Sequence, residues 1–235
     1  MKKLTFVQGI KEGLPICFAY VAVSFTFGLQ AVSGGLNAFW ATLISATNLT
    51  SAGQFAGLKM IQEGSYFLLI FFAVFIINSR YMLMSLSLSQ NLAKEVGTKK
   101  RLIMSMFVTD EIFAVSYSKG KNINFNYFMG LATTPFLGWT VGTLLGSLVN
   151  TLLPLSLSLA MGIALYCMFI AIIVPPATKS FAISFCIALS IILSCTFYYL
   201  PYLKQIPFGL TVIICSVISS VVTALAFPIK EDSVC

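Results

Sequence analysis

Charge is scarce in this sequence of 235 residues: 9% of the residues are charged, 58% are hydrophobic, and the mean hydropathy is +0.95. A soluble domain has about 25% charged and about 45–50% apolar residues. A chain with so little charge cannot cover a water-facing surface, so its surroundings must include lipid. Because lipid offers the backbone no hydrogen bonds, the chain must form helices or a closed barrel.

Histidine is absent altogether. This absence argues against a His-ligated metal site and against a proton relay through imidazole. The six cysteines show no Cys-x-x-Cys spacing, so we interpret them as small core residues and expect neither disulfides nor a cofactor. The sequence also has no nucleophile elbow and no paired metal ligands, which disfavours an intramembrane enzyme.

The apolar runs are about 20 residues long without alternation, which predicts transmembrane helices and not barrel strands. They extend roughly over residues 14–32, 37–60, 66–92, 102–118, 126–149, 155–174, 180–200 and 206–228. Segments 37–60 and 102–118 differ because polar residues interrupt their middles. We predict an all-α, polytopic integral membrane protein with about six spanning helices plus two re-entrant or broken segments. Residues 1–235 would form a single transmembrane transport domain.

The net charge is +7, and the basic residues lie between the apolar segments. This spacing disfavours nucleic-acid binding and favours the positive-inside pattern of membrane proteins. If segments 37–60 and 102–118 enter and leave on one side, only Lys59 and Lys204 lie outside, with Arg80 set apart inside the membrane. If all segments span, the basic cluster at 94–101 falls outside together with Lys204. The first arrangement fits better and predicts that both termini are cytoplasmic. We expect the protein in a bacterial-type inner membrane.

The polar interruption of segment 37–60 is the first candidate substrate-binding stretch, and it contains Thr47, Asn48, Ser51, Gly53 and Gln54. Non-helical backbone at membrane depth persists only where protein or trapped water satisfies it, and transporters use such breaks to aim helix ends at substrate. The freed N–H groups could bind an anion such as a carboxylate. The alternative is a polar packing seam between helices.

The second candidate stretch is Asn78, Arg80 and Tyr81, which lie more than three helical turns from the nearest charged residues, Glu63 and Lys94. An arginine at mid-helix costs about 2.5–3.5 kcal/mol on insertion scales. Such a charge is retained only with a partner or a function. We therefore predict that this stretch contacts the substrate.

The third candidate is the acidic pair Asp110 and Glu111 in segment 102–118. Either carboxylate could pair with Arg80, bind a substrate ammonium, or carry a proton, since burial raises a carboxyl pKa and a nearby arginine lowers it. A structural ion pair with Arg80 and a water-facing surface position are the alternatives. Separately, the repeat of Gly138, Gly142 and Gly146 every four residues predicts close helix packing.

Four motifs follow one another along the chain: GIKEGLP at 9–15, SAGQFA at 51–56, NSRYMLMS at 78–85 and TDEIFA at 109–114. Together they resemble the AzlC family, the large subunit of bacterial branched-chain amino acid exporters, most strongly over residues 5–120. Many family members have His after the intramembrane arginine, where this chain has Tyr81, so no imidazole role carries over. The resemblance implies export of Leu, Ile, Val or analogues with a small AzlD-type membrane partner.

These two lines of argument meet in one mechanism. The carboxylate of the amino acid would bind at residues 51–54 with help from Arg80, and its ammonium would lie near Asp110 or Glu111. Its side chain would contact apolar residues at the midplane, with membrane lipid around the helices. Proton antiport is a plausible driving force. The alternative is a channel-like or scaffolding subunit whose partner carries the substrate path.

Overall fold

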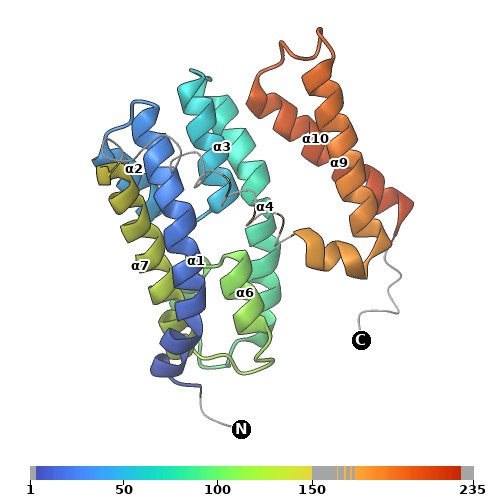
Figure 1. Cartoon of the computed structure of the whole chain (residues 1–235). Helices are drawn as coiled ribbons and strands as arrows, with labels where there is room; N and C mark the ends of the chain where they lie inside the picture. Colours follow the sequence, from blue (N-terminus) through green and yellow to red (C-terminus); the bar gives the residue numbers. More distant parts are fainter. Residues whose placement is uncertain (1–3, 150–162, 164–166, 168–169, 171–172, 229–235) are drawn as a thin grey trace. The chain divides into compact units, whose positions relative to one another are not determined.

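The computed structural model describes residues 4–149, 163, 167, 170 and 173–228 (Figure 1). Apart from one isolated bridge between Leu92 and Ile123, the regular structure in these residues is helical, which confirms the all-α prediction. The helices are α1 Phe6–Ser33, α2 Ala38–Thr47, α3 Ser51–Gln62, α4 Phe67–Asn91, α5 Thr98–Ser105, α6 Asp110–Tyr117, α7 Phe125–Val149, α9 Phe181–Tyr199 and α10 Phe208–Ala226.

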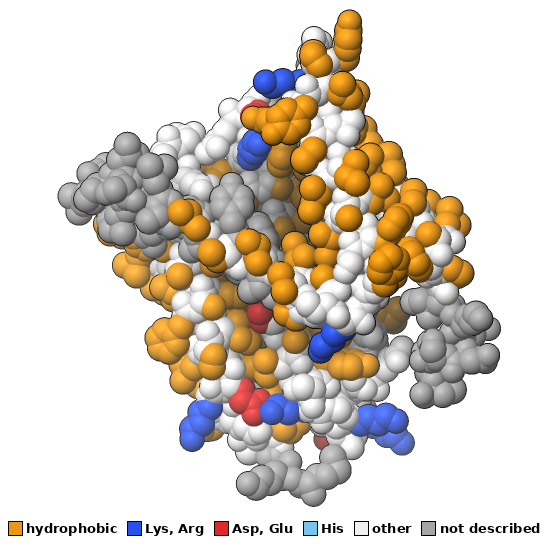
Figure 2. Space-filling view, turned by 45° about the vertical axis from the view of Figure 1, so that its right-hand side comes forward, with side chains coloured by type: hydrophobic (Ala, Val, Ile, Leu, Met, Phe, Trp, Pro, Cys, Tyr) orange, Lys and Arg blue, Asp and Glu red, His pale blue; other side chains and the backbone are white. Residues whose placement is uncertain are grey.

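Among the described residues, five helices are long and apolar enough to cross a membrane: α1, α4, α7, α9 and α10. Each matches a predicted spanning segment. The predicted segment 155–174 lies, except for a few residues, outside the described part of the chain. Apolar side chains dominate the face seen in Figure 2, and α9 buries none of its residues. Apolar surface on this scale is typical of helices in contact with lipid.

The chain divides into two compact units, which are described separately. Unit 1 contains the described residues of 1–55 and 78–165, and unit 2 those of 56–77 and 166–235. Helices α3 and α4 each contribute one part to unit 1 and the other part to unit 2. A single transport domain over residues 1–235 stays a prediction.

Helices α1 and α7 pack side by side along most of their length in unit 1 (Figure 1). Gly142 and Gly146 of α7 lie directly against the α1 backbone at Val21 and Phe25. From the other side, Gly9 of α1 lies against the backbone of α7 near Tyr127. The predicted close packing of the glycine repeat is thereby confirmed. Because early residues of α1 meet early residues of α7, the two helices run in the same direction.

The unit 1 part of α4 runs opposite to α1. Asn91, at the end of α4, accepts a hydrogen bond from Ile123, and the neighbouring Asn124 donates to Leu4, just before α1. Had the predicted segment 37–60 crossed fully, α4 would be the third crossing and parallel to α1, so its antiparallel course means that this segment turns back on itself. Segment 102–118 lies between α4 and α7, which run in opposite directions, so it turns back as well.

Helices α2 and α3 form the first hairpin. Helix α2 begins beside the end of α1, and its Ser45 hydroxyl lies 2.6 Å from that of Thr143 on α7. The helix stops at Asn48, and α3 begins at Ser51. The first turn of α3 then heads back, because Phe55 packs on Phe27 of α1 with ring centroids 5.3 Å apart.

Helices α5 and α6 form the second hairpin, which enters from the opposite end of unit 1. Near its tip, Phe107 packs on Phe136 with ring centroids 5.5 Å apart. After the tip, α6 returns toward the start of α1, where Lys119 pairs with Glu12 at 2.8 Å. The predicted interruptions of segments 37–60 and 102–118 are therefore confirmed as two broken hairpins.

In unit 2, α9 and α10 form an antiparallel pair. Phe227, after the end of α10, contacts the rings of Phe181 and Phe185 at the start of α9. At the other end, Gly209 of α10 lies against Met60, in the last turns of α3. The close approach at Gly209 joins α10 to the unit 2 part of α3.

Candidate functional site

The tips of both hairpins meet in the middle of unit 1, beside α1 and α7. Residues from both tips line one shared cluster, and the lining residues are Tyr20, Leu49, Ser51, Tyr81, Thr109, Asp110, Glu111 and Trp139. Helices α3 and α6 both start here, so their N-terminal ends converge on the cluster. A helix N-terminus carries free N–H groups and a partial positive charge, which favour an anion. These lining residues enclose no volume that a water molecule could enter, so the site is closed in this structure.

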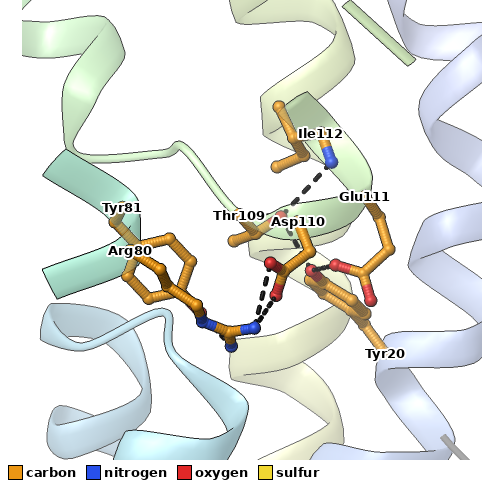
Figure 3. Close-up of polar contacts among 7 residues, drawn as sticks. All are labelled: Tyr20, Arg80, Tyr81, Thr109, Asp110, Glu111 and Ile112. Atoms are coloured by element: carbon orange, nitrogen blue, oxygen red, sulfur yellow. Dashed lines mark hydrogen bonds and ion pairs between the residues drawn. The ribbon is translucent and has the colours of Figure 1, made fainter. Parts of the chain in front are cut away.

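Arg80 and Asp110 form the ion pair at one side of the cluster (Figure 3). The Arg80 Nη1 atom lies 2.9 Å and 3.0 Å from the two carboxylate oxygens of Asp110. Its Nη2 atom donates to the Tyr81 hydroxyl at 3.1 Å. The Arg80 side chain is 36% exposed and that of Asp110 is 23% exposed. The intramembrane arginine therefore has its partner across the hairpin tip, as one of the predicted alternatives required.

Glu111 and Tyr20 form the second polar pair (Figure 3). The Tyr20 hydroxyl donates to Glu111 Oε2 at 2.5 Å and lies 2.8 Å from Thr109 Oγ1. The Tyr20 ring packs edge-on against Trp139 of α7, with centroids 5.1 Å apart. Tyr20 thus ties the second hairpin tip to the α1–α7 seam.

The local sequence explains why Asp110 and Glu111 lie at the start of α6. Thr109 is the N-cap, and its hydroxyl accepts from the Ile112 N–H at 3.4 Å. Asp110 and Glu111 occupy the first turn, where negative charge complements the helix dipole. The sequence Thr-Asp-Glu therefore both starts the helix and presents two carboxylates at the tip.

Gln54 is not among the residues that line the cluster. Its side chain is 2% exposed and lies within the first hairpin, where its Nε2 atom donates to Ser45 at 2.5 Å. Its Oε1 atom accepts from the Trp139 indole at 2.9 Å. Because both ends of the amide are occupied, Gln54 holds α2, α3 and α7 together in this state, which is the packing-seam alternative.

The other predicted residues of the first break lie at varying distances from the cluster. Ser51 lines it, whereas the exposed Thr47 directs its hydroxyl to the Leu43 carbonyl of its own helix. Asn48 accepts from Thr50 at 2.7 Å and so shapes the tip.

Gly53 and Asn78 meet at the start of α3. The amide of Asn78 lies against Gly53, where a Cβ would collide with it. The Asn78 Oδ1 atom is buried and accepts no hydrogen bond from the described residues. A buried amide oxygen without a donor is available to an N–H or O–H group of a ligand.

Four cluster residues were not among the predicted site residues: Tyr20, Leu49, Thr109 and Trp139. Tyr20 and Trp139 lie in long apolar helices, where an aromatic residue is most often a packing residue. The position of Thr109 could have been predicted from the sequence, because a threonine directly before two acidic residues is a helix N-cap signal.

The family comparison covers this site. The AzlC protein family profile matches residues 15–153, which include every residue of the cluster. The chain belongs to the AzlC family. The inner membrane protein YgaZ of Escherichia coli K12 is 28% identical over 145 residues, or 60% of this chain and 59% of the relative. An uncharacterized membrane protein of Archaeoglobus fulgidus is 32% identical over 144 residues, or 61% of this chain and 62% of the relative.

This AzlC protein therefore matches about three-fifths of the length of each of these relatives. Both relatives are named as membrane proteins, one of them as an inner membrane protein, which agrees with the apolar helices of this chain. No solved structure matches the chain. Membership in the family and the helical architecture together show a membrane protein of the AzlC family and are consistent with a transport-related role.

Proposed function

We propose that this chain is a secondary transporter that exports branched-chain amino acids, Leu, Ile, Val or analogues, together with a small membrane partner of the AzlD type. The observation that carries the proposal is the convergence of two hairpin tips on an ion pair, Arg80 with Asp110, and on a second carboxylate, Glu111, that accepts a hydrogen bond from Tyr20. A zwitterion needs one cation and one carboxylate within reach of each other. The two carboxylates line the cluster beside apolar Leu49 and the Trp139 ring, and the Arg80 cation lies at its side, paired with Asp110.

The opposed hairpins support transport as the activity. Helix α1 with the first hairpin and α4 with the second hairpin follow the same plan in opposite directions. Inverted-topology repeats with discontinuous helices at their interface are typical of secondary transporters, which bind substrate there. In this reading the substrate carboxylate binds Arg80 and the start of α3, and its ammonium binds Glu111.

We propose proton antiport as the driving force. A substrate ammonium and a proton cannot bind the same carboxylate at once, so their binding would alternate. One proton moving inward across 100 mV supplies about 2.3 kcal/mol, enough for a gradient of roughly fifty-fold. In the closed cluster, the Asp110 carboxylate pairs with Arg80. We propose that the substrate carboxylate takes the place of Asp110 on Arg80 when substrate binds.

Leucine efflux from proteoliposomes tests the proposed function. We expect the full-length chain, reconstituted with its partner, to release preloaded leucine and to do so faster when the outside is acidic. Efflux that is indifferent to the pH gradient would refute proton coupling. If the partner alone releases leucine and this chain alone does not, the scaffolding alternative is correct.

Tyr20→Phe tests the contact between α1 and the second hairpin. The variant keeps the ring on Trp139 and removes the hydroxyl from Glu111, so we expect leucine export to fall about tenfold, as for loss of a hydrogen bond to a charged group. Folded protein, measured by size-exclusion chromatography, should remain near the parent amount. Tyr117→Phe, at the exposed end of α6, is the matched control and should export normally. Equal export by the two variants would remove Tyr20 from the site.

A further inference from the structure

A large cavity lies in unit 2, apart from the cluster described above. It is formed by the end of α3, by α9 and α10, and by the loop between them, and its volume is about 750 Å³. Binding sites for small molecules have volumes of about 300–1,000 Å³. The cavity is therefore the right size for a ligand larger than water, whereas the cluster at the hairpin tips is closed.

Three charged side chains line this cavity: Lys59, Glu63 and Lys204. Lys59 and Lys204 are the two basic residues that the charge pattern predicts outside the membrane, and the fold brings both to one cavity. The Lys59 Nζ atom lies 3.9 Å from Glu63 Oε1, and both side chains are about half exposed. An exposed ion pair of this length contributes little stability, so both groups can rebind to a ligand at small cost.

The rest of the lining is apolar or carries hydroxyl groups. Phe197, Val212 and Cys215 supply apolar surface, and Ser194 and Thr211 supply hydroxyls. A site of this composition can hold a branched apolar side chain beside polar groups that orient it.

The two lysines and the one glutamate determine which class of ligand fits this cavity. A purely anionic ligand would have to approach the Glu63 carboxylate, and a purely cationic ligand would have to approach two lysines. A zwitterion with an apolar side chain satisfies all three. We propose that this cavity is a second amino-acid site on the outer side of the membrane, with the carboxylate on Lys204 and Lys59 and the ammonium on Glu63. The choice of an amino acid as the ligand of this cavity rests on the proposed function.

Two ligands that differ by one group test the proposal: leucine and 4-methylpentanoate, which is leucine without its ammonium. Binding is measured to the purified full-length chain in nanodiscs of phosphatidylglycerol, which has no zwitterionic headgroup. Lys204→Gln should weaken the binding of both ligands at this site by about tenfold or more, because each ligand loses a charge-assisted hydrogen bond. Glu63→Gln should weaken the binding of leucine, whereas the affinity for 4-methylpentanoate should stay equal or increase. Lys121→Gln, a loop lysine of unit 1, is the charge-matched control and should change neither.

The outcomes separate the two proposals. If the wild type binds two leucines per chain and Lys204→Gln loses one of them, the second site is supported. If the wild type binds one leucine per chain and Lys204→Gln does not change that binding, the second site is refuted and the proposed function stands. No leucine binding at all refutes the substrate class, and with it both proposals. A zwitterionic lipid headgroup is the other source of this chemistry. If added phosphatidylethanolamine displaces leucine only from the Lys204-dependent site, the cavity is a lipid site and the proposal is wrong.

Discussion

Arg80→Gln is expected to reduce leucine export at least about thirtyfold. The variant removes the cation that we assign to the substrate carboxylate, and it leaves Asp110 without its partner at 2.9 Å. Breaking a hydrogen-bonded charge pair costs about 2–5 kcal/mol. Because the Arg80 side chain is 36% exposed, we expect the low end, about 2 kcal/mol, for the loss in free energy of unfolding. Export is measured as leucine efflux, and stability as unfolding in detergent.

A charge swap distinguishes a binding role from a structural ion pair. Arg80→Asp combined with Asp110→Arg rebuilds the pair in reverse, at a cost of about 0.3–1 kcal/mol for a cation at the start of α6. We expect stability to return and export to stay low, because the cation now lies on the wrong tip for the substrate carboxylate. Full recovery of export by the swap would mean that the pair is only structural. Arg101→Gln, on α5, is the matched control and should leave export unchanged.

The sequence was sufficient for the architecture because the membrane constrains it so strongly. Apolar length predicts the long helices, and polar residues in the middle of an apolar run predict a break, since lipid cannot satisfy free backbone groups. The positive-inside count preferred two segments that turn back, and the antiparallel course of α4 agrees. The length and composition of the helices do not tell which side of the membrane faces the cytoplasm, so cytoplasmic termini stay a prediction.

The site residues were harder to predict from the sequence than the architecture was, for a physical reason. The Tyr20 hydroxyl meets Thr109 and Glu111 across about ninety residues of chain, and periodicity does not tell which face of α1 meets which hairpin. A polar residue in an apolar segment also has two explanations that look alike in sequence. Gln54 and Arg80 were both predicted to bind substrate, but the amide of Gln54 is satisfied by Ser45 and Trp139.

Gly142→Ala is expected to destabilise the protein, because the seam between α1 and α7 leaves no room for a methyl group. The new Cβ would collide with the Ser24 hydroxyl and lie 2.7 Å from the Val21 carbonyl oxygen. Ser24 can rotate away, but the Val21 backbone cannot. Overpacking of this kind costs about 1–3 kcal/mol, more than the roughly 1 kcal/mol that alanine gains over glycine within a helix.

Gly57→Ala is the matched control, because Gly57 also lies within a helix. The only neighbour that its Cβ would meet within 4 Å among the described residues is a Val74 methyl at 3.4 Å, an ordinary contact. We therefore expect this variant to be neutral or stabilised by up to about 1 kcal/mol. Unfolding of both variants in detergent measures the difference, and leucine efflux should fall only in Gly142→Ala, since α1 carries Tyr20 and α7 carries Trp139 to the site. If the two variants were equally stable, close contact at Gly142 would not be what holds α1 to α7.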